Sequence, residues 1–464
     1  MASQRLEHRP TRADLDALLR LAAPLVLIQV GAMLMGVVDT IMVGRVSAQA
    51  LAAVALGNLY YFVLSIFGMG VLMALDPIIA QALGARDEIA VARGLQRGLV
   101  LTVALSIPIS LLMLTARPVL TWVGQPPAVI PDAVGYIDRL IPSVWPFYAF
   151  IVLRQTLQAH RRTAPIVLTI VAANLLNAGL NYLWVYGELG FAPRGALGSA
   201  WATTASRWFM AALLVAVGWR DVRPYLSHRA PNLFEPRSLA RMLKLGSPIG
   251  AQMVLEIGAF GTVALLMGWL GVVQVAAHQV ALNLASLTFM VPLGVSSAAA
   301  VIVGHAVGRG DTAGVRRSTG AALIVGAAFM LCAGALFVGA PRLLARVYTS
   351  DAAVIALTVQ LLPIAGVFQV FDGLQVVSIG LLRGLGDTQV PVVTNIVGFW
   401  CLGMPVSLWL GFGAGYGAVG LWWGLVVGLV MVALFLMLRV RQRQSRGLAR
   451  VVIDDHSPPS IATE

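Results

Sequence analysis

The sequence predicts an all-α polytopic membrane protein with twelve transmembrane helices, arranged as two pseudo-symmetric lobes of six helices each. Of its 464 residues, 59% are hydrophobic and only 11% are charged, whereas roughly 25% of the residues of a soluble globular protein are charged. Apolar runs long enough to cross a bilayer, which takes about 20 residues, alternate with charged or Pro- and Gly-rich breaks. The second half of the chain also repeats the first.

The breaks between the apolar runs set the expected limits of the spans. The twelve expected spans cover residues 16–44, 50–80, 92–116, 129–155, 163–187, 196–219, 240–269, 275–305, 317–340, 352–382, 390–412 and 415–439. Their even number places both ends of the chain on the same side of the membrane.

An internal repeat relates the first six spans to the last six. Pro248 follows Pro24 by 224 positions (248 − 24), and the same offset relates further pairs without a gap. These pairs are Gly44 and Gly268, Ala52–Ala53 and Ala276–Ala277, Gly70 and Gly294, Gly84 and Gly308, Asp87 and Asp311, and Arg93 and Arg317. Six spans per half give both lobes the same orientation, so an axis along the membrane normal relates them, as in many secondary transporters.

The basic residues predict the orientation in the membrane. The chain has a formal net charge of +12, but its arginines gather at alternate span ends and not on one soluble surface, so we expect no nucleic-acid partner. The positive-inside rule places the arginine-rich ends, and with them both termini, in the cytoplasm. We expect a cytoplasmic N-terminal segment at 1–15, an N-lobe at 16–219, a cytoplasmic linker at 220–239, a C-lobe at 240–440 and a cytoplasmic tail at 441–464.

Three carboxylates lie inside long apolar runs: Asp39, Glu256 and Asp372. An ionised carboxylate at the centre of a bilayer costs at least about 2.5 kcal/mol, so it persists where it faces the protein interior or a wet cavity and handles ions or substrate. One such acid could be a structural partner, but three acids spread over both halves indicate a transport pathway.

The acids do not follow the repeat. The offset that relates the halves maps Asp39 to Val263 and Glu256 to Ala32, so the two lobes have different functions. Glu256 and Asp372 both belong to the C-lobe. They could share a proton, because neighbouring carboxylates hinder each other's ionisation, or coordinate a hard cation such as sodium through oxygen ligands.

A stripe of amides follows one face of the fifth span. Asn174, Asn177 and Asn181 are spaced by three and four residues and therefore share a helix face. Buried amides in a membrane need hydrogen-bond partners. Asp39 of the same lobe is one candidate partner, and hydrogen bonds between helices that merely hold them together are the alternative.

Other polar residues have two interpretations each. Asp76, near the end of the second span, suits a helix end or a gate, and Arg207, within the sixth span, could neutralise a buried acid or mark a helix end. Gln279 and Asn283 could line a cavity or bond to a neighbouring helix. We expect His160, His278 and His305, near span ends, at the membrane interface.

Known catalytic and nucleotide-binding motifs do not occur in the sequence. It contains no GxxxxGK[ST], which argues against direct use of ATP, and no HExxH, GxSxG or paired CxxC. We therefore expect no enzymatic activity and no cofactor. The two cysteines, Cys332 and Cys401, indicate neither a disulfide framework nor a metal site.

Four segments resemble the multidrug and toxic compound extrusion family, in its bacterial NorM-type branch. They are VVDTIMVGR (37–45), ALDPIIAQALGARD (74–87), QVAAHQVALNLASLTFMVPLGVSSAAAVIVGHAVGRGD (274–311) and QVFDGLQVVSIGLLRGLGD (369–387). The similarity covers residues 15–440. It implies a two-lobe antiporter of the bacterial inner membrane that expels organic cations while sodium ions or protons enter.

The resemblance also implies roles for individual residues. The family's C-lobe cation-site acids match Glu256 and Asp372, and its N-lobe acid matches Asp39, with partners that match Asn177, Asn181 and Thr203. Sodium-coupled relatives often have tyrosines near the C-lobe site, where this chain has Phe289 and Phe368. Their missing hydroxyls favour protons over sodium.

These observations together predict a secondary active multidrug antiporter that works as a monomer in the lipid bilayer. Its partners would be organic cations and H⁺ or Na⁺, the latter held at Glu256 and Asp372. A lipid-linked or glycan flippase is one alternative, which should present a strongly cationic cavity. A membrane-embedded acyltransferase is another, which would need a His–acid or nucleophile constellation.

Overall fold

The computed structural model describes residues 10–227, 230, 232–445 and 448–454, and among these it contains helices and no strand. The first group of helices consists of α2 (Arg12–Gly44), α3 (Ala48–Leu72), α4 (Leu75–Gly84), α5 (Glu88–Met113), α6 (Ala116–Trp122), α7 (Ile130–Leu140), the 3-10 turn η1 (Ile141–Ser143), α8 (Val144–Ala159), α9 (Ala164–Tyr186) and α10 (Gly195–Leu226). The second group consists of α11 (Pro236–Leu270), α12 (Val272–Gly308), α13 (Thr312–Gly339), α14 (Pro341–Tyr348), α15 (Ala352–Gly384), α16 (Gln389–Asn395), the π-helix η2 (Ile396–Gly403), α17 (Met404–Leu408), the π-helix η3 (Trp409–Gly413) and α18 (Gly417–Ser445).

The expected spans correspond to these helices. Eleven helices of the described chain are long and apolar enough to cross a membrane. The remaining expected span, 129–155, is formed by α7, η1 and α8 in succession, with Pro142 in the turn between the two helices. The all-α, twelve-span prediction is therefore confirmed.

Several helix ends differ from the expected limits. Helix α10 continues to Leu226 and α18 to Ser445, beyond the expected lobe ends at 219 and 440. Both extensions are rich in arginine, and a helix does not need to end where the bilayer does. The span expected at 390–412 contains two π-helical segments, η2 and η3, a geometry that is rare and is found most often at functional sites.

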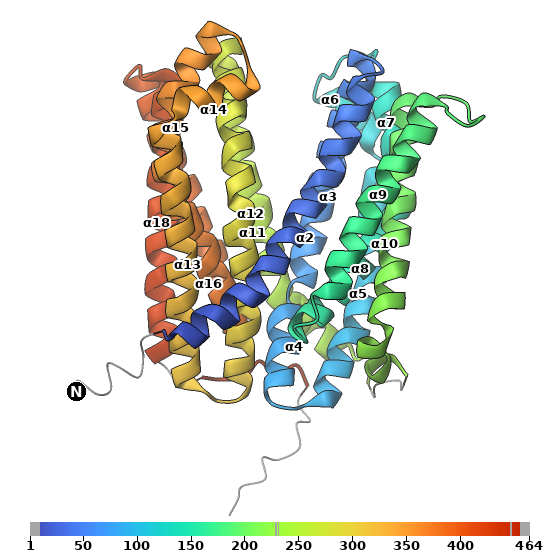
Figure 1. The fold of residues 1–464 in the computed structure, drawn as a ribbon, viewed down its shortest axis with the longest axis vertical. Coiled ribbons are helices and arrows are strands. Elements are labelled where there is room, and N and C mark those ends of the chain that lie inside the picture. Colours follow the sequence, from blue (N-terminus) through green and yellow to red (C-terminus); the bar gives the residue numbers. More distant parts are fainter. Residues whose placement is uncertain (1–9, 228–229, 231, 446–447, 455–464) are drawn as a thin grey trace, which may run out of the picture.

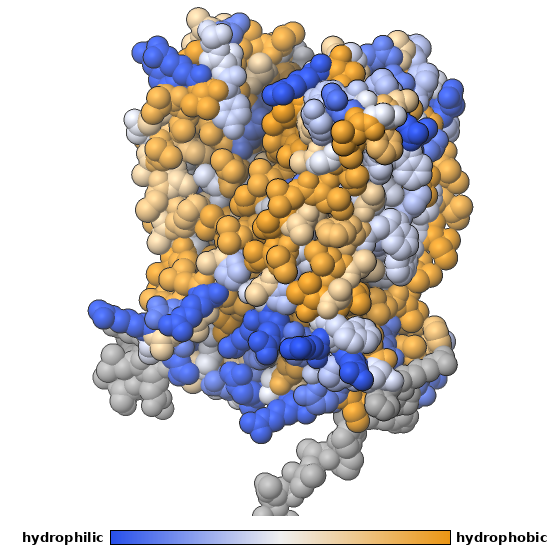
Figure 2. All heavy atoms as spheres, turned by 45° about the vertical axis from the view of Figure 1, so that its right-hand side comes forward, coloured by the Kyte–Doolittle hydropathy of each residue, from blue (hydrophilic) through white to orange (hydrophobic). Residues whose placement is uncertain are grey.

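The two groups of helices form two lobes that converge at one end and diverge toward the other (Figure 1). The chain's described N-terminus, the α4–α5 turn and the end of α18 lie at the converging end. We call this end the basic face. Its arginines include Arg86, Arg93, Arg97, Arg241, Arg309, Arg317, Arg439 and Arg450. Figure 2 shows a broad hydrophobic belt above a strongly hydrophilic rim at this face.

Equivalent residues of the repeat occupy equivalent places in the two lobes. Asp87 caps the N-terminus of α5 by accepting a hydrogen bond from Ala90 N, and Asp311 caps α13 by accepting one from Gly314 N. A carboxylate at this position satisfies an amide that the first turn leaves unpaired. The repeat therefore preserves the turn that starts the third long helix of each lobe.

Glycines of the repeat also bring the lobes together near the basic face. A Cβ at Gly84 would overlap the backbone of His305, and a Cβ at Gly308 would overlap that of Gln81. Gly70 packs against Gly250 in the same way. Such small residues allow helix backbones to approach closely in membrane proteins. The interface between the lobes is consequently tight at the basic face.

Candidate functional site

The buried carboxylate of Asp39 in the N-lobe accepts hydrogen bonds from polar side chains of two other helices. Asp39 of α2 is 2% exposed. Asn181 Nδ2 of α9 donates to Asp39 Oδ1 over 2.7 Å, and Thr203 Oγ1 of α10 donates to Asp39 Oδ2 over 2.7 Å. Three helices thus converge on one carboxylate group, and both of its oxygens accept a hydrogen bond.

The three asparagines of α9 do not share one function: two lie beside Asp39, and one bonds to a neighbouring helix. Asn177 and Asn181 are fully buried beside Asp39. Asn174, in contrast, donates to the carbonyl oxygens of Gly31 in α2 (3.0 Å) and of Ile170 (2.8 Å). Asn174 therefore holds α9 against α2, while the next two amides of the stripe face the carboxylate.

Asn177 is the least satisfied member of this group, in which Asn174 Oδ1 and Asn181 Oδ1 also lack a hydrogen-bond partner in the described chain. Neither polar atom of its side chain has a hydrogen-bond partner among the described residues. A buried amide without a partner is costly and uncommon. Its position beside Asp39 leaves a donor and an acceptor available to a ligand at this site.

Arg207 lies one helical turn beyond Thr203 on α10 and brings a positive charge to the N-lobe. Its Nη1 donates to Ser143 Oγ over 2.8 Å. Its guanidinium carbon lies 4.1 Å from the ring centre of Tyr61 and 5.1 Å from that of Phe147, and stacking of this kind stabilises a desolvated cation. Arg207 also has a weak electrostatic interaction with Asp39 but forms no ion pair with it within 4.0 Å in the described chain.

The C-lobe holds the other two acids on facing helices. Glu256 of α11 accepts a hydrogen bond from Gln252 Nε2 (3.1 Å), one turn earlier, and one from Gln375 Nε2 of α15 (2.8 Å). Asp372, three positions before Gln375 on α15, is 6% exposed and interacts electrostatically with Glu256. The structure thus brings together the two acids that the sequence separates by more than a hundred positions.

Two carboxylates in one buried site repel each other. A proton on one of them or a cation between them removes this repulsion. Gln375 and Asn395, which both interact with Glu256, each keep a buried side-chain oxygen without a hydrogen-bond partner in the described chain. Among the described residues no group of three His, Cys, Asp or Glu side chains forms a metal site, so a cation here would need these amide oxygens.

Three site residues were not singled out in the sequence: Gln252, Gln375 and Asn395. Asn395 is fully buried and interacts with the Glu256 carboxylate. It ends α16 directly before the π-helix η2. Polar residues one turn from an intramembrane acid, at i−4 and i+3, were the available signal for the two glutamines. Nothing local in the sequence indicated Asn395.

The aromatic residues of the C-lobe lie one turn away from the acids. Phe368 is buried, and its ring centre lies 5.9 Å from that of Phe260 and 6.0 Å from that of Trp422. Phe260 follows Glu256 by one turn and Phe368 precedes Asp372 by one turn, so this aromatic cluster covers the acid pair on one side. Phe289 is half-buried against the hydrophobic core.

Gln279 and Asn283 do not join the acid site through any direct hydrogen bond in the described chain. Both are exposed, and Gln279 Nε2 donates to Asn283 Oδ1 over 3.1 Å. The two side chains bond to each other along one face of α12. Neither is hydrogen-bonded to a neighbouring helix or to Glu256 or Asp372 in the described chain.

His278, which we expected near a span end, is buried inside the protein. It is 1% exposed, packs edge-on against Trp422 of α18 with ring centres 5.7 Å apart, and has no hydrogen-bond partner for either ring nitrogen in the described chain. His305, in turn, contacts the carbonyl oxygen of Ala159 in the other lobe (2.8 Å).

The comparison with known families matches both halves of the chain. The MatE family matches residues 24–183 and again residues 248–409. The two matches begin at Pro24 and Pro248, the prolines that set the register of the internal repeat. The repeat is therefore a property of the family and not a chance similarity between two Ala- and Gly-rich sequences.

Known relatives align with almost the whole chain. A probable multidrug resistance protein NorM of Mesorhizobium japonicum is 37% identical over 452 residues, covering 95% of this chain and 97% of that protein. The multidrug resistance protein NorM of Burkholderia vietnamiensis is 35% identical, covering 93% and 94%.

Solved structures share the fold. The eukaryotic MATE transporter AtDTX14 superimposes with a TM-score of 0.84 at 22% identity, covering 93% of this chain and 98% of that one. An outward-facing multidrug resistance MATE transporter gives 0.83 at 20% identity, covering 94% and 99%. These structures agree with the two-lobe, twelve-span architecture. The family matches and the NorM relatives together show that the chain belongs to the MatE family, the multidrug and toxic compound extrusion family, in its NorM-type branch.

Proposed function

We propose that the protein is a secondary active multidrug efflux antiporter, which exports organic cations in exchange for inward H⁺ or Na⁺. The observation that carries this proposal is the presence of two separate carboxylate sites inside the lobes, the buried Asp39 in one lobe and the half-buried Glu256 beside the buried Asp372 in the other. The relatives named as multidrug resistance proteins NorM support the same function.

The two sites suit different ligands. Both oxygens of Asp39 already accept hydrogen bonds from side chains of its own lobe, and Arg207 adds a weaker electrostatic attraction. Glu256 and Asp372 lack an arginine partner in the described chain, and their repulsion favours a bound proton or cation. We therefore assign the coupling ion to the C-lobe, and drug turnover or a lobe rearrangement to Asp39, Asn177, Asn181 and Thr203.

The arrangement of the lobes suits alternating access. The lobes are packed tightly at the basic face and diverge toward the other end, so a substrate site between them would be open to one side only. Coupling then requires that the driving ion and the drug favour different conformations, because a ligand shifts an equilibrium only by its differential affinity. The phenylalanines at 289 and 368 offer no hydroxyl ligands, which favours H⁺ over Na⁺.

Arg207 also bears on the flippase alternative. A carrier of phosphate-bearing lipids should present a strongly cationic cavity, whereas the guanidinium of Arg207 stacks on two aromatic rings and donates to Ser143 Oγ. This arginine is therefore held by protein groups, and the drug antiporter remains the better-supported function.

Vesicles containing the purified protein and no ATP test this function. We expect an imposed H⁺ or Na⁺ gradient to drive uptake of a fluorescent organic cation in inverted vesicles, and each gradient should be applied alone to identify the ion. Transport that needs ATP despite an imposed gradient would contradict the antiporter.

The orientation is part of the proposal. We place the basic face, both termini and the segment between α10 and α11 in the cytoplasm, and the chain in the bacterial inner membrane. A cysteine at Ser227, in a chain whose exposed Cys332 and Cys401 are replaced by alanine, should resist impermeant thiol reagents applied outside intact cells. Rapid labelling from outside would reverse the orientation.

A further inference from the structure

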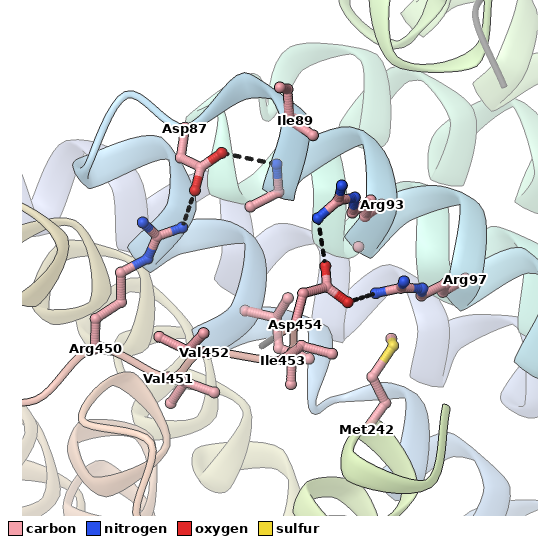
Figure 3. Close-up of a pocket in the computed structure, with 13 residues that line it drawn as sticks. Asp87, Ile89, Arg93, Arg97, Met242, Arg450, Val451, Val452, Ile453 and Asp454 are labelled. Atoms are coloured by element: carbon pink, nitrogen blue, oxygen red, sulfur yellow. Dashed lines mark hydrogen bonds and ion pairs between the residues drawn. The ribbon is translucent and has the colours of Figure 1, made fainter. Parts of the chain in front are cut away.

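The C-terminal segment 448–454 crosses the basic face and contacts both lobes (Figure 3). Near its start, Arg450 Nη2 lies 2.8 Å from Asp87 Oδ2 at the α4–α5 turn. Val451 N donates to Gln81 Oε1 of α4 over 2.7 Å, and the carbonyl oxygen of Ile453 accepts from Arg241 Nη1 of α11 over 2.8 Å. The segment therefore follows a defined path across several helices. We call it the strap.

Gln81 links the strap to the interface between the lobes. It is fully buried, and its Nε2 donates to the carbonyl oxygen of Gly384 in α15 over 2.9 Å while its Oε1 accepts from Val451 N. Gly386, just after α15, lies directly beneath the Val451 side chain, and any Cβ there would overlap it. One residue of the N-lobe thus holds both the C-lobe and the strap.

Asp454 anchors the far end of the strap. It accepts from Arg93 Nη1 (2.8 Å) and Arg97 Nη1 (2.7 Å) of α5 and from Ser238 Oγ (2.7 Å) of α11. Arg97 is 1% exposed. One carboxylate therefore joins an N-lobe helix to the first helix of the C-lobe, and its removal would leave a buried arginine with less of its charge compensated.

The strap covers the rim of the interface that has to open at the basic face. Beneath it lie the close contacts of Gly84 and Gly308, and the buried pair formed by Arg383 of α15 and Asp76 of α4, 3.4 Å apart. A second carboxylate, Asp14 of α2, lies 3.6 Å from Arg317 of α13 at the same face. The strap adds charge-assisted hydrogen bonds, which are the stronger kind, at the cost of ordering a short segment.

We propose that residues 448–454 act as a conformational strap, which holds the lobes together at the basic face and has to detach from them before they separate there. This inference rests on the alternating access proposed above. The ion pairs of the strap oppose the entropy cost of ordering it, so binding and release of the strap can accompany a transport cycle. Its bound form stabilises the conformation that is closed at the basic face.

The distance between the lobes at the opposite face tests the proposal. Nitroxide labels on Thr121→Cys at the end of α6 and Ser350→Cys after α14, in the Cys332→Ala, Cys401→Ala chain, report that distance by double electron–electron resonance. Asp454→Asn should shift the distribution toward short distances and raise the share of molecules closed at that face by roughly tenfold, the change expected on losing one hydrogen bond to a charged group.

Asp387→Asn is the matched control. Asp387 also binds two arginines at the basic face, Arg439 (2.8 Å) and Arg443 (3.4 Å), but both belong to the C-lobe. The Asp387→Asn variant should leave the distance distribution unchanged. The double variant Arg93→Gln, Arg97→Gln should reproduce the effect of Asp454→Asn. The strap proposal is overturned if the distances stay unchanged in both the Asp454→Asn variant and the double arginine variant. It is also overturned if Asp387→Asn shifts the distance distribution as much as Asp454→Asn does. The label distances report the population of each conformation and do not depend on transport. If the antiport proposal alone fails, the distance shift caused by Asp454→Asn is still seen while ion-driven uptake is absent.

Discussion

Arg383 of α15 and Asp76 of α4 form a buried ion pair across the interface between the lobes, with 3.4 Å between Nη1 and Oδ2. The side chains are 4% and 2% exposed. Arg383 also contacts Ser296 Oγ and Met73 Sδ. This pair places Asp76, near the end of the second span, in a contact between the two lobes.

Breaking this pair from one side should destabilise the protein strongly. Asp76→Asn leaves a buried guanidinium without its counter-charge, and such changes typically cost about 3–5 kcal/mol. We expect a clear fall in the thermal unfolding temperature of the purified protein in detergent.

The double variant Asp76→Leu, Arg383→Met should be less destabilised than either of its single variants, because the guanidinium of Arg383 is removed together with its counter-charge. Additive losses in this double-mutant cycle would show that the two side chains do not interact in the protein.

Removing one acid of the C-lobe pair should abolish coupling without unfolding the chain. Glu256→Gln or Asp372→Asn keeps most of the side-chain volume and replaces a carboxylate by an amide, which is less costly to bury. We expect drug resistance to be lost while expression and thermal stability are retained or increased. Cation-induced drug release from the purified variants, with sodium and pH varied separately, is the measurement. Full release in both variants would place the coupling site elsewhere.

The N-lobe stripe offers a matched pair of substitutions. Asn181→Ala removes a donor to Asp39 and should reduce drug turnover, whereas Asn174→Ala removes only hydrogen bonds to backbone oxygens. Each change should cost stability, about 1–3 kcal/mol for the bond to a carboxylate and about 1 kcal/mol for the neutral bonds. Transport rates normalised to folded protein separate the two, and equal losses of turnover would contradict the assignment of Asn181 to the site.

The strap should be insensitive to pH over the physiological range. Burial raises the pKa of Asp454, but hydrogen bonds from Ser238, Arg97 and Arg93 outweigh it and hold that pKa below its ordinary value of 3.8. A lowered pKa means that the carboxylate contributes its full stabilisation above the ordinary value and loses it as the pH falls through the bound value. Glu235, 3.8 Å from Arg97, and Arg241 are the other charged groups that face this end of the strap.

A nitroxide on Val452→Cys, in the chain without native cysteines, reports release of the strap through its mobility. We expect a constant, restricted spectrum from pH 8 to pH 5 and mobilisation only in stronger acid, below the ordinary pKa of 3.8. Mobilisation near pH 6 would mean that another titrating group controls the strap.

Much of the architecture was determined by the sequence itself. Hydrophobic runs that can satisfy their own backbone only as helices predicted the spans, and the Pro24–Pro248 register predicted two related lobes, because these features depend on local composition and order. The same reasoning identified Asp39, Glu256 and Asp372, since a charge within an apolar run is visible in any single sequence.

Tertiary structure alone decided which of these groups meet. Helical periodicity places Asn174, Asn177 and Asn181 on one face but does not say which of them reaches Asp39, because that depends on the angle at which α9 crosses α2. Gln375 and Glu256, 119 positions apart, become hydrogen-bonded partners only because the fold of the C-lobe places α15 opposite α11. His278 is buried against Trp422 of α18, and the strap contacts Arg93 and Arg97 only after both lobes have assembled. In each case the partner lies on another helix, and the packing of the helices selects it.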